Sequence, residues 1–215
     1  MNIGVLGTGI VGQTIADKLI SVGHNVKMGS RSANNEKALE WASKNPKNAS
    51  AGTFSEATQF GEVIFLATKG DVTLDVIKLA DLTNFTGKTV IDISNPLDFS
   101  QGFPPTLSIC NTNSLGEEVQ KILPEAHVVK ALNTLTASLM VAPEKLPLDT
   151  DLFICGNSAE GKATVKRLLE EFGWKNIIDL GDITNARGTE QLLPLWVRLY
   201  AAFGSGEFNF KIVRS

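Results

Sequence analysis

The sequence is poor in the residues that build metal centres and disulfide frameworks. Its 215 residues include only two cysteines and two histidines. Cys110 and Cys155 form no C-x-x-C pair, and His24 and His127 have no Cys or His neighbour at ligand spacing, so we expect no metal site. We interpret both cysteines as reduced thiols in or near the core, as is typical of a reducing compartment.

Long apolar runs and basic clusters are also missing. No window is apolar over the roughly 20 residues that a membrane-spanning helix needs. No run of lysine and arginine occurs, and the formal net charge is -3, which argues against a nucleic-acid or anionic-lipid partner. A strand-like segment begins at residue 2, so we expect no secretion signal. The sequence therefore predicts a cytoplasmic protein that binds neither nucleic acid nor membranes.

Short β-rich segments alternate with helical patterns along the chain, as in βαβ units. Hydrophobic residues make up 43% and charged residues 20%, which are ordinary values for a globular domain. No linker divides the chain. We predict one α/β domain over residues 1–215, with a doubly wound, mostly parallel Rossmann-type sheet. The strands are expected at residues 2–6, 25–28, 63–67, 89–93, 128–132, 151–155 and 176–180.

The helices carry recognisable start signals. Thr53 with Glu56 and Ser114 with Glu117 have the spacing of capping boxes. Asp71 is expected to cap the helix that follows it. Between the strand ending at residue 93 and Ser114, a long loop rich in Pro, Gly, Ser and Asn has the length of a functional loop. The expected helices cover residues 10–22, 35–43, 72–80 and 159–172, with short ones after Thr53 and Ser114.

The C-terminal segment, residues 181–215, is unusually apolar. Residues 182–203 predict one long helix, which Pro194 should bend or break. Residues 207–213 alternate apolar and polar side chains like a half-buried strand. We expect this segment to cover the substrate side of the sheet. So much apolar surface would also suit a lid or a homodimer contact, but packing with a contribution to the pocket is favoured.

A G-x-G-x-x-G run follows the first strand and opens the first helix, which is the context that a dinucleotide-binding turn requires. The first glycine permits the tight turn, the second lets the backbone approach a pyrophosphate, and the third lets the helix pack on the strand. Free N–H groups at the start of the helix then face the phosphates. The predicted cofactor-binding residues here are Gly7, Thr8, Gly9, Ile10, Val11 and Gly12.

The end of the second strand distinguishes the two nicotinamide dinucleotides. NAD-binding domains place a carboxylate there, which holds the ribose 2′-hydroxyl. This chain has Ser30 and Arg31 instead, with Lys37 nearby. A guanidinium and a hydroxyl suit a 2′-phosphate, and no carboxylate repels it. We therefore predict NADP(H) as the cofactor, held by Ser30, Arg31 and Lys37.

Several blocks of sequence occur in the order found in one known family. They are residues 7–12, Gly-Ser-Arg at 29–31, Asp-Ile-Ser-Asn-Pro-Leu at 92–97, His-Val-Val-Lys-Ala-Leu-Asn-Thr at 127–134, Cys-Gly at 155–156, Asn-Ala-Arg at 185–187 and Gly-Glu at 206–207. With these blocks the chain resembles the NADPH-dependent deazaflavin (coenzyme F-420) reductases over nearly its whole length. It is also similar to the cytosolic oxidoreductase domain of STEAP-type metalloreductases.

The resemblance implies how three further segments contribute to the site. Ala67, Thr68 and Lys69 would line the adenosine and ribose path. Asn95, Pro96 and Leu97 would sit beside the nicotinamide, and Ala131, Leu132 and Asn133 would border the substrate pocket. Each segment follows or ends an expected strand, and ligands of such sheets bind at the carboxyl ends of the strands.

The implied reaction is hydride transfer between NADPH and a flavin-like or deazaflavin ring, for which we expect no catalytic acid, base or nucleophile. Deazaflavin reductases often carry a histidine where this chain has Asn133, whereas the metalloreductases carry asparagine. Asn133 and Thr134 either hydrogen-bond the nicotinamide or acceptor ring or cap the strand end. Two alternatives stay open: a reductase of another small molecule, with Lys69 or Lys130 as proton donor, and a non-enzymatic NADP(H) sensor.

Overall fold

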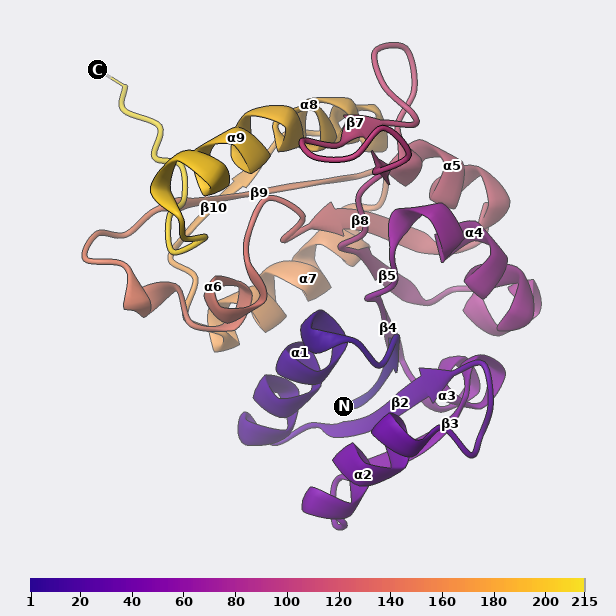
Figure 1. The fold of residues 1–215 in the computed structure, drawn as a ribbon. Helices are drawn as coiled ribbons and strands as arrows, with labels where there is room; N and C mark the ends of the chain where they lie inside the picture. Colours follow the sequence, from indigo (N-terminus) through magenta and orange to yellow (C-terminus); the bar gives the residue numbers. More distant parts are fainter. Residues whose placement is uncertain (215) are drawn as a thin grey trace.

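An eight-stranded sheet runs through the protein in the computed structural model, which describes residues 1–214 (Figure 1). The strand order is β10-β9-β8-β5-β4-β1-β2-β3, and every neighbouring pair is parallel except β8 and β9. The predicted Rossmann-type fold is therefore confirmed. The strands are β1 Asn2–Leu6, β2 Asn25–Ser30, β3 Ala49–Thr53, β4 Val63–Leu66, β5 Thr89–Asp92, β8 His127–Ala131, β9 Asp151–Gly156 and β10 Asn176–Asp179.

The helices cover both faces of this sheet. One buried cluster joins α1, α2, α6 and α7 to the sheet, and a second joins α3, α4, α5 and α8 to the opposite face. Successive strand residues alternate between them, as Phe65 and Leu66 do in β4. The helices are α1 Ile10–Ser21, α2 Glu36–Lys44, α3 Phe54–Phe60, α4 Gly70–Leu79, α5 Leu115–Ile122, α6 Ala137–Val141, α7 Ala159–Glu171, α8 Ala186–Gln191 and α9 Leu193–Phe203. Three 3₁₀ turns lie at Leu82–Phe85, Pro143–Lys145 and Ile183–Asn185.

The start signals of the helices were predicted with mixed success. Thr53 and Glu56 form the complete capping box before α3. Ser114 accepts from the Glu117 N–H, but its own N–H donates to Asn113 Oδ1, so only half of that box forms. The prediction for Asp71 was wrong: α4 begins earlier, with Lys69 as its N-cap and Asp71 inside the first turn.

The C-terminal segment differs most from its prediction. The expected long helix is divided into a 3₁₀ turn, α8 and α9, with Pro194 in the first turn of α9, where its missing N–H costs nothing. Residues 207–213 form no strand. Instead, Phe208 stacks on Trp196, and the Phe210 carbonyl accepts from the Asp151 N–H at the start of β9.

Three smaller differences have simple causes. The strand β3 was not predicted because its sequence, Ala-Ser-Ala-Gly-Thr, has little β-branched or aromatic character. β9 runs antiparallel to β8, and the segment between them holds the five-residue α6 and the 3₁₀ turn Pro143–Lys145 instead of a long crossover helix. Cys155 is buried as expected, but Cys110 is exposed. Among the described residues no helix is long and apolar enough to cross a membrane.

Candidate functional site

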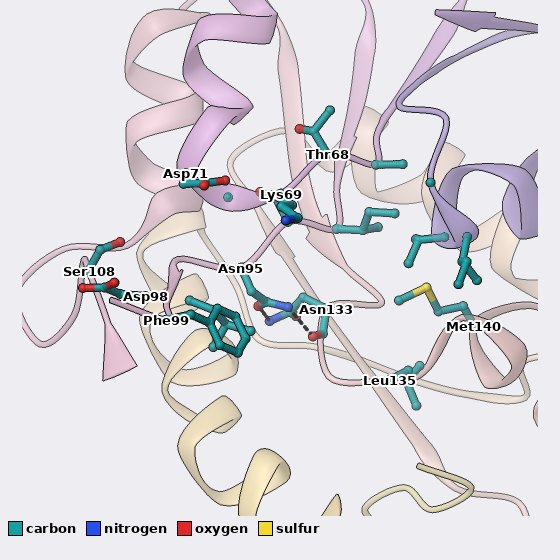
Figure 2. Close-up of a pocket in the computed structure, with 18 of the residues that line it drawn as sticks. Thr68, Lys69, Asp71, Asn95, Asp98, Phe99, Ser108, Asn133, Leu135 and Met140 are labelled. Atoms are coloured by element: carbon teal, nitrogen blue, oxygen red, sulfur yellow. Dashed lines mark hydrogen bonds between the residues drawn. The ribbon is translucent and has the colours of Figure 1, made fainter. Parts of the chain in front are cut away.

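A cavity of about 790 Å³ opens at the carboxyl ends of β1, β4, β5 and β8 (Figure 2). It lies where the strand order reverses direction between β1 and β4, the position at which open α/β sheets bind their ligands. Its walls are Gly9, Ile10, Val11, Ala67, Thr68, Lys69, Gly70, Asp71, Ile93, Ser94, Asn95, Leu97, Asp98, Phe99, Ser100, Ser108, Asn133, Leu135 and Met140.

The three glycines of the β1–α1 turn are needed for different reasons. A Cβ at Gly7, whose φ is +129°, would lie 2.4 Å from the Ala67 carbonyl oxygen, and a Cβ at Gly12 would lie 2.2 Å from the Gly7 carbonyl oxygen. The protein itself therefore requires Gly7 and Gly12. A Cβ at Gly9 would meet no protein atom within 4 Å. The fold therefore does not require glycine at position 9, and the missing side chain leaves open space in which a ligand could approach the backbone.

The start of α1 suits an anion at that place. Gly9 is the N-cap, and no side chain caps this helix. Its first N–H groups and the positive end of its dipole therefore face the cavity. The Thr8 carbonyl accepts from the side chain of Gln13, which holds the turn in shape. The residues present fit the pyrophosphate of a dinucleotide.

The residues predicted to select NADP(H) lie at the end of β2 (Ser30) and beyond it (Arg31 and Lys37), outside the cavity wall. Arg31 and Lys37 are exposed, and neither forms an ion pair with another of residues 1–214. Both cations are thus available to a phosphate. Ser30 is buried, and its hydroxyl donates to the Ser32 carbonyl over 2.5 Å, so its proton already has a partner.

The segment after β4 forms one side of the cavity. Ala67, Thr68 and Lys69 all line it, as predicted. The Thr68 hydroxyl lies 2.9 Å from that of Thr73, which fixes its direction. A Cβ at Gly70 would lie 2.0 Å from the Asn95 carbonyl oxygen, so the start of α4 packs closely against the loop after β5.

Asn95 and Asn133 lie side by side in the cavity wall, as Figure 2 shows. Asn95 Nδ2 donates to the Asn133 carbonyl over 2.7 Å, and Asn133 Nδ2 donates to Asn95 Oδ1 over 3.0 Å. Leu132, directly before Asn133, has a φ of +62°, a conformation that non-glycine residues rarely adopt. This turn brings Asn133 back toward the cavity at the end of β8.

Three predicted residues lie behind the wall rather than in it. Ala131 and Leu132 are buried in the core, and Pro96 is buried with its carbonyl accepting from Ser108. Leu97 lines the cavity and begins the short hairpin of β6 Leu97–Asp98 and β7 Thr106–Leu107. Pro96 and Ala131 support the wall from behind, whereas Asn95, Leu97 and Asn133 face the cavity.

Sequence reasoning missed the apolar wall. Ile93, Leu135 and Met140 line the cavity and are nearly fully buried, while Phe99 is 58% exposed at the rim. In Figure 2, Leu135 and Met140 lie to one side of the asparagine pair, and Asp98 and Ser108 to the other. The one signal in the sequence was the long loop after β5, which contains Phe99 but none of Ile93, Leu135 and Met140.

Lys130 is unavailable as a proton donor to the cavity. Its side chain is fully buried, and its ammonium group lies 2.9 Å from Asp92, 2.7 Å from Glu190 and 2.6 Å from the Ser94 carbonyl. Burial alone would lower the pKa of Lys130, but the charges of Asp92 and Glu190 outweigh burial and raise it. Of the two lysines considered as proton donors, only Lys69 faces the cavity.

Comparisons with known proteins agree with this geometry. Residues 2–96 match the family model described as NADP oxidoreductase coenzyme F420-dependent. The F420-dependent NADP reductase of Methanocaldococcus jannaschii is 31% identical over 155 residues, 70% of this chain and 69% of that protein. Metalloreductase STEAP3 of Rattus norvegicus is 29% identical over 199 residues, but the match spans 37% of its length.

A solved structure extends the likeness to the whole chain. A protein from Arthrobacter sp. FB24, provisionally described as an F420-dependent NADP reductase, is 45% identical, with complete coverage of both chains and a TM-score of 0.95. The resemblance predicted from the sequence blocks is confirmed. On these grounds, the chain belongs to the family of coenzyme F420-dependent NADP oxidoreductases.

Proposed function

We propose that the protein transfers a hydride between NADP(H) and a deazaflavin or flavin-like acceptor. The observation that carries this proposal is the continuous path from the free backbone at Gly9 to the amide pair of Asn95 and Asn133, within one cavity. A phosphate-binding turn at one end and an apolar, amide-bearing wall at the other suit a dinucleotide and a second planar ring.

The predicted residues would divide the cofactor among them. The turn Gly7–Gly12 would hold the pyrophosphate, and Arg31 with Lys37 would bind the 2′-phosphate. Ser30 would contribute only if its hydroxyl left Ser32. The segment Ala67–Lys69 would follow the ribose. Asn95, Pro96, Leu97, Ala131 and Asn133 would border the nicotinamide, directly or from behind.

When bound, the nicotinamide supplies the hydride, and the chain's own residues orient the two rings. Ile93, Leu135 and Met140 exclude water from one side. The amides of Asn95 and Asn133 offer hydrogen bonds at the ring edge. The hydride passes directly between two positioned rings, so no protein nucleophile is needed. This agrees with the burial of Lys130, whose ammonium group is bound to Asp92 and the Ser94 carbonyl.

Two observations bear on the acceptor. The two F420-dependent NADP reductases of Methanocaldococcus jannaschii and Methanothermobacter marburgensis match over 69% and 92% of their own length, against 37% for STEAP3, which supports a deazaflavin. Asn133, where such reductases often have histidine, leaves a flavin open. A reductase of imines or keto acids would need a proton donor in the cavity, and of the two lysines considered only Lys69 is placed for that role, since Lys130 is held by Asp92 and Glu190.

The proposal is tested by mixing the protein with NADPH under anaerobic conditions and following nicotinamide absorbance. The acceptors are FMN, FAD, a deazaflavin, a ferric chelate, a quinone, an imine and a keto acid. We expect turnover with a deazaflavin or flavin and much slower reaction with NADH. Tight NADPH binding without turnover of any acceptor would instead indicate a sensor, and turnover confined to an imine or keto acid would replace the proposed reaction.

A further inference from the structure

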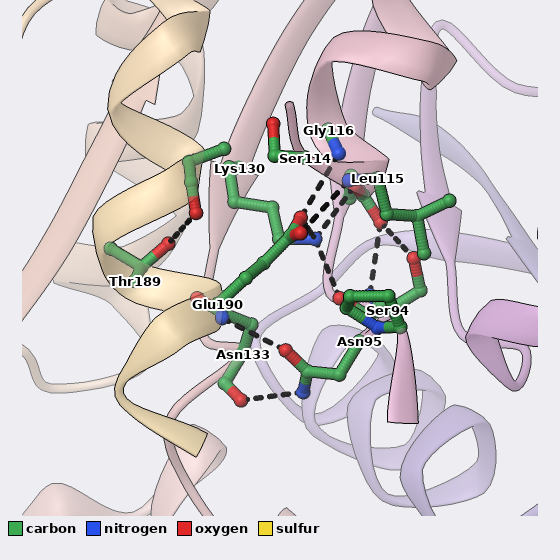
Figure 3. A network of polar contacts seen from close by, with 12 residues as sticks. Ser94, Asn95, Ser114, Leu115, Gly116, Lys130, Asn133, Thr189 and Glu190 are labelled. Carbon is green, nitrogen blue, oxygen red and sulfur yellow. Dashed lines mark hydrogen bonds and ion pairs between the residues drawn. The ribbon is translucent and has the colours of Figure 1, made fainter. Parts of the chain in front are cut away.

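We propose that Asp92, Lys130 and Glu190 form a positioning network that holds the Asn95–Asn133 amide pair and ties the C-terminal helices to it (Figure 3). The inference rests on the proposed function, since it gives these three residues a role toward the nicotinamide. None of them lines the cavity. They act through other residues and are positioning residues, not catalytic ones.

The first part of the network fixes the chain as it leaves β5. Asp92 ends this strand, and its Oδ1 accepts from both the N–H and the hydroxyl of Ser94, over 2.9 and 2.6 Å. Lys130, the cross-strand partner of Asp92 in β8, donates to Asp92 Oδ2 and to the Ser94 carbonyl. The backbone N–H and carbonyl of Ser94 are therefore both fixed by hydrogen bonds, directly before Asn95.

The second part ties α8 to the same place. Glu190 Oε1 lies 2.7 Å from the Lys130 ammonium, while its two carboxylate oxygens accept from the N–H groups of Leu115 and Gly116. Those N–H groups belong to the first turn of α5, where a carboxylate is favoured. One side chain of α8 thus joins β8, α5 and, through Lys130, the loop after β5.

The network has a high energetic cost that stability alone does not explain. The side chains of Asp92, Lys130 and Glu190 are all at most 1% exposed. Removing charges from water is expensive, and well-packed apolar residues often stabilise a core at least as well as a buried ion pair. Each N–H of the ammonium group has its own acceptor, so the geometry is fully specified. Such specification suits a group that must hold a neighbouring segment in one position.

Both halves of the amide pair adjoin this network. Asn95 follows Ser94 directly, and Asn133 follows Lys130 after the turn at Leu132. Figure 3 shows the two asparagines lying next to Ser94 and the Lys130–Glu190 contact. A shift of Glu190, which stands just before the break between α8 and α9, would therefore move Ser94 and with it Asn95. The placement of the C-terminal segment is in this way linked to the nicotinamide end of the cavity.

The test compares Glu190→Gln, Lys130→Met and Ser94→Ala with the wild type. In Glu190→Gln an amide NH2 replaces one of the two oxygens that accept from the N–H groups of Leu115 and Gly116. Two donors then face each other, so the network breaks with little change in side-chain volume. Ser94→Ala removes a single side-chain hydrogen bond and serves as the variant that folds if the others do not. NADPH affinity is measured by fluorescence titration, the nicotinamide environment by the emission of bound NADPH, and turnover by kcat and KM with the acceptor found above.

We expect the Kd for NADPH to change less than about threefold, since the phosphate-binding residues are untouched, whereas kcat falls about tenfold or more. The emission of bound NADPH should shift toward that of NADPH in water. The double variant Lys130→Met/Glu190→Gln should lose little more than Lys130→Met alone, because both changes break one network. Leu168→Ala in the buried part of α7 is the control, with a loss in melting temperature but wild-type kcat and emission.

The opposite results are distinguishable. If Glu190→Gln and Ser94→Ala keep the wild-type kcat and emission while only the melting temperature falls, as in Leu168→Ala, the network is structural and the inference is wrong. Additive losses in the double variant would also overturn it. A wild-type protein that does not bind NADPH would contradict the proposed function itself, and with it the role of the network toward the nicotinamide.

Discussion

Asn133 reaches across the cavity to Asn95, and the two residues exchange a pair of hydrogen bonds of 2.7 and 3.0 Å. They come from segments that follow β8 and β5, two neighbouring strands. In the proposed function this pair borders the nicotinamide, and its polar atoms are oriented by each other. Its removal should therefore affect the reaction more than the binding of the phosphates.

Asn133→Ala should lower kcat about tenfold, the effect of losing one positioned hydrogen bond, with a small change in the KM for NADPH. Steady-state kinetics with NADPH and the preferred acceptor measures both constants. Asn133→His introduces the residue often found in deazaflavin reductases and should raise the ratio of deazaflavin to flavin turnover. Asn84→Ala, outside the cavity, is the control, and an equal loss there would contradict a specific role for Asn133.

Gly9→Ala should weaken NADPH binding without destabilising the protein. The added Cβ meets no protein atom, and the backbone angles of Gly9, φ -77° and ψ 178°, are open to alanine. The methyl group would occupy the space we assign to the pyrophosphate, so we expect a rise in Kd of about tenfold or more, measured by fluorescence titration.

Gly12→Ala gives the reverse pattern. Its Cβ would lie 2.2 Å from the Gly7 carbonyl oxygen, so we expect a loss of folding free energy of at least about 1–3 kcal/mol, measured by urea denaturation. Gly188→Ala in α8 is the matched control for Gly9→Ala, because a Cβ at either glycine meets no protein atom within 4 Å. Gly188→Ala should stabilise the protein slightly and leave the Kd for NADPH unchanged. Unchanged NADPH affinity in Gly9→Ala would show that no ligand approaches this turn.

Arg31→Glu should raise the KM for NADPH about 10–100-fold and leave that for NADH nearly constant or lower. The change removes a charge-assisted hydrogen bond to the 2′-phosphate and adds repulsion. Kinetics with the two cofactors gives the ratio directly. Lys166→Glu, an exposed charge reversal on α7, should affect neither cofactor. Equal losses with NADPH and NADH in Arg31→Glu would refute the assignment of Arg31.

The two cysteines should react very differently with a thiol reagent. Burial raises the pKa of Cys155 to about 12, and the thiol has no access to solvent, whereas Cys110 is exposed. At pH 8 we expect a colorimetric thiol reagent to label one cysteine in the folded protein and both in urea. The variant Cys110→Ser should show no fast labelling. Rapid reaction of that variant would mean that β9 opens readily.

The Glu117–Arg187 ion pair should stabilise the protein at neutral pH, and this stabilisation should be lost in acid. The hydrogen bond from Arg187 holds the pKa of Glu117 below its ordinary value of 4.5. A lowered carboxyl pKa contributes stability above about pH 4.5 that is lost as the pH falls through the lower folded value. Glu117→Gln should therefore lower the denaturation midpoint at pH 7. The difference from the wild type should shrink as the pH falls below about 4.5 and Glu117 becomes protonated, and a difference that stays constant through this fall would have a cause other than the charge.

Local pattern was enough for much of the fold. The strand, glycine turn and helix at residues 2–21 were predicted because hydrophobic periodicity and the glycine spacing lie within one short segment. The same reasoning failed for β3, whose small residues carry no strand signal, and for residues 207–213, whose alternation reflects packing of Phe208 on Trp196 and Phe203. In both cases a neighbouring element, not the local sequence, decides the conformation.

The amino-acid sequence by itself determined the family, the glycine turn after β1 and the cations beyond β2, because each is encoded by residues close together in the chain. Only the tertiary structure decided which polar groups meet. Asn95 and Asn133 are 38 residues apart, and Glu190 reaches Leu115 across 75 residues. Such contacts depend on strand order and helix packing. No local spacing encodes them, so Lys130, which could be taken for a proton donor from its sequence, proves to be a buried ion-pair partner.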